Sequence, residues 1–126
     1  MSAPRRFPVV ATRRFERALE ALLDHYDRIR HLHPDAGSHA LRLIDLVEGE
    51  LPRVLTAHPD IGRPAQLSLI QIESEKQWLK RLAPLTARRR LQAREWLLGD
   101  FWILYYRTAS AVYLVSARHE REAEYR

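Results

Sequence analysis

The chain has 126 residues, of which 46% are hydrophobic and 29% charged, a composition that excludes wholesale disorder and favours one domain. The charge fraction and the lack of a long apolar run exclude a membrane protein, so we expect a cytoplasmic protein. The absence of cysteine excludes disulfides, thiolate nucleophiles and cysteine-ligated zinc. A net charge of +5 favours polyanionic partners, either nucleic acid or an acidic protein.

The N-terminal part predicts a short strand followed by a helix. Residues 7–12 are β-prone, and Pro8 suits a strand start or a sheet edge. Thr12 is a suitable cap for a helix of about five turns. Its apolar face is formed by Phe15, Leu19, Leu22, Leu23, Tyr26 and Ile29.

A second helix is expected after the break at residues 33–37. Ser38 is its predicted N-cap, and its apolar face comprises Ala40, Ile44, Val47, Leu51 and Leu55. Pro52 lacks an amide proton, so it must kink this helix or begin a further short turn. A second break, rich in turn residues, covers residues 58–64. The short loop between the two helices predicts an antiparallel hairpin.

The C-terminal third predicts strands. Residues 68–93 are ambiguous, and we favour a helix there. Residues 95–98 lead to a tight turn at Gly99-Asp100. Residues 101–107 are apolar on both faces and are expected to be the central strand, and residues 112–117 return antiparallel after a turn at 108–110. We therefore expect an α+β domain in which the N-terminal strand and helical hairpin pack on a small antiparallel sheet.

The polar tail after the last strand is the first candidate site. His119, Arg121, Glu122 and Tyr125 combine an acid–base group, a phosphate-binding cation and a phenol, which are the groups that ribonuclease chemistry requires. Arg107 and Arg94 lie at strand ends and add cations that can converge on the same edge. The alternative is a solvated, charged tail with two surface arginines whose stems are packed.

Basic side chains elsewhere form a second candidate, for target binding. Arg88, Arg89 and Arg90 are consecutive, and Arg118 lies near the end of the last strand. These side chains can bind phosphates, or they can simply form a solvated face.

Metal and cofactor signals are weak. His31, His33, Asp35 and His39 span a proline-containing loop without regular ligand spacing, so no metal site is expected. The sequence contains no phosphate-binding glycine loop and no nucleophile elbow, and no cofactor is expected.

Three segments of the chain together carry a resemblance to a known protein family. HPDIGRP at 58–64, after the helical hairpin, is similar to a P-x-I-G-R-P turn common in these proteins. REWLLGDFWILYYR at 94–107 looks like the family's arginine–strand–glycine–aromatic–strand pattern. SARHEREAEYR at 116–126 is similar to the closing H-x-R-E-x-x-Y. These segments resemble the RelE/ParE superfamily of toxins from bacterial type II toxin–antitoxin systems. The resemblance covers 1–126 as a single domain, and we expect a helical insertion at about 66–93.

The resemblance implies a growth-inhibitory toxin that a cognate antitoxin neutralises in a hetero-oligomer. RelE-like members cleave mRNA on the ribosome, which would make His119, Arg121, Tyr125, Arg107 and Arg94 the catalytic residues. ParE-like members inhibit DNA gyrase. In these families an arginine often follows the aromatic residue in the central strand, but here Phe101 is followed by Trp102. Loss of a phosphate-facing cation weakens the stabilisation of charge in the transition state.

We therefore expect a ParE-like toxin that inhibits DNA gyrase. The alternatives are a RelE-like endoribonuclease and a decayed member that only binds a partner. Whether the protein is an enzyme stays open.

Overall fold

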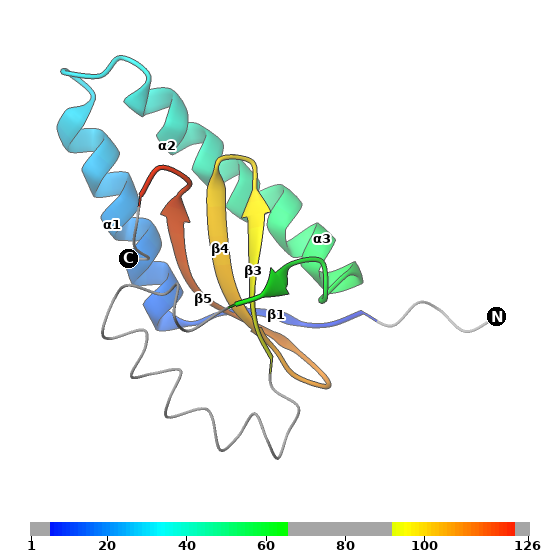
Figure 1. Ribbon diagram of the computed structural model, residues 1–126. Helices are drawn as coiled ribbons and strands as arrows, with labels where there is room; N and C mark the ends of the chain where they lie inside the picture. The colour runs from blue at the N-terminus through cyan, green and yellow to red at the C-terminus, as the bar shows by residue number, and fades with distance from the viewer. Residues whose placement is uncertain (1–5, 66–91, 123–126) are drawn as a thin grey trace.

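The computed structural model describes residues 6–65 and 92–122, which form one helical layer and one sheet (Figure 1). The elements are β1 (Val9–Ala11), α1 (Arg13–Ile29), α2 (Ala36–Asp45), the π-helical turn η1 (Leu46–Glu50), α3 (Leu51–Ala57), β2 (Arg63–Pro64), β3 (Gln92–Leu98), β4 (Phe101–Arg107) and β5 (Val112–His119). The α+β class predicted from the sequence is confirmed. In this part of the chain no helix is long and apolar enough to cross a membrane.

Helix α1 begins where the sequence predicts. The Thr12 hydroxyl accepts a hydrogen bond from the Phe15 amide at 3.2 Å, which satisfies one of the open donors of the first turn. The same hydroxyl donates to the Leu114 carbonyl at 2.6 Å, so the cap also ties the helix start to β5. The buried face of α1 is formed by Phe15, Ala18, Leu22 and Tyr26.

The second helix begins earlier than predicted. Ser38 is its third residue rather than its cap; the cap position belongs to Asp35, whose carbonyl accepts the His39 amide at 3.0 Å. Burial of Ala36 against the core starts the helix at that residue. The prediction for Pro52 is confirmed, because a short helix, α3, begins at Leu51 directly after the wide turn of η1.

The sheet has the order β1-β5-β4-β3-β2 within the described residues, so β4 is central as predicted. Strands β3, β4 and β5 form an antiparallel meander, and Gly99 takes φ 59° in the predicted tight turn. The expectation of a purely antiparallel sheet is wrong, because β1 pairs parallel to β5, with Val9 opposite Val112. Parallel pairing requires a long connection between the two strands, and the elements from α1 to β4 provide it.

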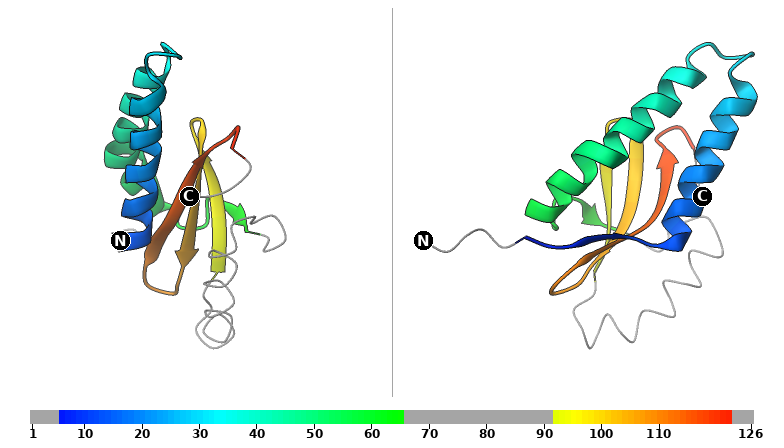
Figure 2. Two further views of the ribbon diagram at one scale, coloured as in Figure 1. Left: turned by 90° about the vertical axis from the view of Figure 1, so that its left-hand side faces the viewer. Right: turned by 180° about the vertical axis from the view of Figure 1, so that it is seen from behind.

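The helical hairpin covers one face of the sheet, with α1 beside β5 (Figures 1 and 2). The core between the two layers includes Phe15, Leu22, Leu43, Leu55, Phe101, Ile103, Tyr105 and Leu114. The predicted insertion at 66–93 must end sooner, because Gln92 and Ala93 already pair with β4. Residues 66–91, where a helix was favoured, lie outside the described residues.

Candidate functional site

Of the residues predicted to be catalytic, those that the structure describes lie towards opposite ends of the sheet. His119 is the last residue of β5 and is opposite Phe101, the first residue of β4. Arg107 is the last residue of β4, and Arg94 pairs with Tyr105 near the same end. Arg107 is six residue steps along the extended strand from Phe101, which corresponds to about 20 Å. The expectation that both arginines converge on the tail is therefore wrong.

Arg107 is engaged in a local ion pair. Its Nε atom lies 2.9 Å from Oδ1 of Asp60, and its Nη1 donates to the Thr108 carbonyl at 3.0 Å. The guanidinium also lies over the Phe7 ring, 4.9 Å from its centroid. These contacts connect the turn after α3 to the end of β4. They give Arg107 a structural role.

Arg94 supports the turn at residues 58–64. Its Nη2 donates to the Asp60 carbonyl at 3.0 Å and to the Gly62 carbonyl. Below this turn the buried Tyr105 hydroxyl donates to the Pro59 carbonyl at 2.8 Å and accepts from the Gly62 amide at 3.1 Å. Burial raises the pKa of Tyr105, against the opposing effects of the Gly62 amide and Arg94. The HPDIGRP segment is thus held by β3 and β4.

On the face of the sheet that the helices do not cover, two arginines lie beside an indole ring. We call these residues the Trp102 cluster: Arg63, Trp102 and Arg118. Arg63 lies 4.4 Å from the ring centroid and Arg118 lies 5.8 Å from it. Arg63 also pairs with the buried Glu95, Nε to Oε1 at 3.1 Å. The sequence suggested Arg118 for target binding but gave no sign of Arg63. Its partners, Glu95 and Trp102, lie about 30 to 40 residues away in sequence, so no local pattern identifies them.

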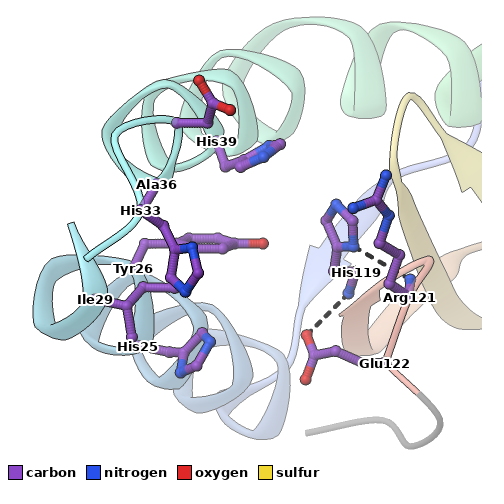
Figure 3. A pocket seen from close by; sticks show the side chains of 10 residues that line it. His25, Tyr26, Ile29, His33, Ala36, His39, His119, Arg121 and Glu122 are labelled. Carbon is purple, nitrogen blue, oxygen red and sulfur yellow. Dashed lines mark hydrogen bonds between the residues drawn. The ribbon is translucent and has the colours of Figure 1, made fainter. Parts of the chain in front are cut away.

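A pocket of about 360 Å³ lies between the helical hairpin and the end of β5. Figure 3 shows His25, Tyr26 and His39 on the helical side, facing His119, Arg121 and Glu122. The pocket's complete lining is His25, Tyr26, Ile29, His33, Asp35, Ala36, His39, His119, Arg121 and Glu122. The predicted tail residues His119 and Arg121 therefore do share a site. Its helical half was not anticipated.

His119 is held by the turn that follows it. The Arg121 amide donates to its Nδ1 at 3.2 Å, and the His119 amide donates to Oε1 of Glu122 at 3.1 Å (Figure 3). The ring makes edge contacts with His39 and Phe101, each at a centroid distance of 5.4 Å. Burial and the nearby His39 lower the pKa of His119, and this lowering is opposed by Asp100, Glu120 and Glu122. The hydrogen bond from the Arg121 amide makes Nδ1 the acceptor nitrogen of the ring.

Two of the histidines that line the pocket also lie close to a carboxylate. One ligand atom from each of His39, Asp100 and His119 lies within 4.8 Å of the other two. His39 comes from α2, Asp100 from the β3–β4 turn and His119 from β5. The sequence interpretation had considered His39 with His31, His33 and Asp35. The fold joins it to different partners.

Tyr125 and Arg88–Arg90, predicted for catalysis and target binding, lie outside the described residues. Among the described candidates, His119 and Arg121 share a pocket, whereas Arg94 and Arg107 stabilise the opposite end of the sheet. No protein-family model and no curated protein matches this chain.

Proposed function

We propose that this protein is the toxin of a type II toxin–antitoxin system, neutralised by a cognate antitoxin, and that it inhibits growth by binding DNA gyrase. The resemblance of residues 58–64, 94–107 and 116–126 to RelE/ParE toxins carries the family part of this proposal. The arrangement of a strand, a helical hairpin and a meander, which that resemblance implies, supports it.

The choice of gyrase over mRNA rests on one observation. Arg107 is ion-paired with Asp60 about 20 Å along the strands from the end that carries His119, and Arg94 is hydrogen-bonded to the 58–64 turn about 14 Å from that end. Cleavage of a phosphodiester needs cations beside the acid–base group, because charge develops on the phosphate in the transition state. In the described residues Arg121 is the cation of the His119 pocket, and neither Arg94 nor Arg107 adds a second one, so we favour binding over hydrolysis.

The Trp102 cluster supplies the surface for the target. An arginine that lies over an aromatic ring presents both apolar area and charge, a combination enriched in protein interfaces. The net charge of +5 favours association with an acidic partner surface. We propose that gyrase contacts this cluster and that the antitoxin binds the helical face.

Inducible expression in a bacterial host tests the proposal, with growth, plasmid supercoiling and ribosome-bound mRNA followed in parallel. The expected result is growth arrest with intact mRNA, and purified protein that blocks supercoiling by gyrase. Co-expression of the cognate antitoxin should restore growth. Cleaved mRNA would instead establish the ribonuclease alternative, and unimpaired growth at confirmed high expression would reject a toxin.

A matched pair of charge reversals locates the contact surface. Arg118→Glu changes the Trp102 cluster. Arg28→Glu makes the same change of charge at an exposed position of α1. We expect Arg118→Glu to reduce inhibition of supercoiling at least about tenfold, which corresponds to the loss of one interface hot spot. Arg28→Glu should act like the wild type. Equal loss in both variants would indicate general electrostatic attraction and contradict a specific contact.

A further inference from the structure

We propose that His39, Asp100 and His119 form a binding site for Zn²⁺ that joins the helical hairpin to the end of the sheet. The three ligand atoms already lie within 4.8 Å of one another, and all three residues are half-buried. Zinc places its ligands about 2.0–2.2 Å away, so a tetrahedral site requires them to be about 3.3 Å apart. Small side-chain rotations would bring the ligand atoms to that separation.

The donor set favours zinc over magnesium or calcium. Imidazole nitrogens suit Zn²⁺, Cu²⁺ and Ni²⁺, whereas Mg²⁺ and Ca²⁺ prefer oxygen ligands. Two histidines and one carboxylate supply three protein ligands and leave the fourth position of a tetrahedral site for water. That position is accessible because His39 and His119 line the 360 Å³ pocket.

The surroundings of the ligands fit this assignment. Asp100 Oδ2 lies 3.8 Å from Nε of Arg42, so the carboxylate is oriented from outside the site. Arg42 is more than half exposed, and solvent screens its repulsion of a bound cation.

Zinc binding has a consequence for the tail. The Arg121 amide now donates to Nδ1 of His119, so the neutral ring carries its proton on Nε2. Ligation through Nε2 moves that proton to Nδ1, and ligation through Nδ1 occupies the acceptor directly. In both cases the hydrogen bond from Arg121 is lost. The metal therefore couples the position of the hairpin to the turn at residues 120–122.

Isothermal titration of the tag-free, full-length protein with Zn²⁺ tests the site. We expect one site per chain. Changes to residues that only support the ligands weaken metal binding about 10–100-fold. The ligand variants His39→Gln, Asp100→Asn and His119→Gln should each weaken Zn²⁺ binding by more than that. His33→Gln is the matched control, because His33 lines the same pocket outside the cluster. Its affinity should equal that of the wild type. Co²⁺ in place of Zn²⁺ should give the visible absorption of a tetrahedral site.

Two results would overturn the proposal. One is no saturable Zn²⁺ binding by the wild type, and the other is an equal loss in His33→Gln and the cluster variants, which would indicate general histidine chelation. Circular dichroism checks that each variant is folded, and Asp100→Asn carries the test if a histidine variant is not. In ¹⁵N spectra, Zn²⁺ should shift the Arg121 amide in the wild type and in His33→Gln, but not in the cluster variants. An unmoved resonance at saturation would reject ligation by His119 as described.

Discussion

The guanidinium of Arg107 lies 2.9 Å from the carboxylate of Asp60, and this ion pair joins the last residue of the central strand to the turn after α3. Asp60 belongs to the HPDIGRP segment, which also receives hydrogen bonds from Arg94 and Tyr105. The sequence had suggested both arginines for catalysis. Their contacts instead stabilise the segment that carries the family resemblance.

Removal of the Arg107–Asp60 pair should lower stability without abolishing growth inhibition. Arg107→Ala and Asp60→Ala should each cost about 1 kcal/mol, because Asp60 is largely exposed and Arg107 also loses its packing on Phe7. A double-mutant cycle by urea unfolding should give a coupling of about 0.5–1 kcal/mol. Folded Arg107→Ala protein that no longer inhibits growth would contradict the structural role.

Tyr105→Phe should destabilise the protein by about 1–3 kcal/mol, because it leaves the Pro59 carbonyl and the Gly62 amide buried without their partner. Tyr113→Phe is the matched control, since Tyr113 is 37% exposed. Its free energy of unfolding should stay within about 0.5 kcal/mol of the wild type. Equal effects of the two changes would show that the Tyr105 hydroxyl does not support the turn.

Gly62→Ala should be destabilising by about 1–3 kcal/mol. A Cβ atom there would lie 2.5 Å from the Glu95 carbonyl oxygen and 3.0 Å from the Tyr105 hydroxyl, so the turn would have to move off β3. Gly37→Ala meets nothing within 4 Å and lies in the first turn of α2. Thermal melts should show a lower Tm for Gly62→Ala only. An unchanged Tm would contradict the close packing of this turn.

Stability should fall as the pH is lowered through the titration of His119. Its pKa is lowered in the folded protein, so the unfolded chain binds the proton more tightly. The protein is then most stable above the unfolded pKa of about 6.5, and it loses stability as the pH falls from there towards the folded pKa. Tm measured against pH should show a smaller loss in His119→Gln. An identical pH profile would assign the loss to other groups.

Much of the local structure follows from sequence alone. The apolar spacing of residues 15–29 predicts α1 and its cap, and the run at 101–107 predicts the central strand. The start of α2 was misplaced because a good capping residue, Ser38, lies only three residues from Asp35. Which residue caps the helix depended on the burial of Ala36, which no local pattern shows.

The chain's own pattern thus determined its elements, because helices and strands impose periods of 3.6 and 2 that adjacent residues must satisfy. The tertiary structure decided which elements meet. It paired β1 with β5, separated Arg94 and Arg107 from His119, and joined His39 to Asp100 and His119. Those contacts connect residues about 60 to 100 positions apart. They depend on how the hairpin packs on the sheet, and such packing leaves no periodic trace in the sequence.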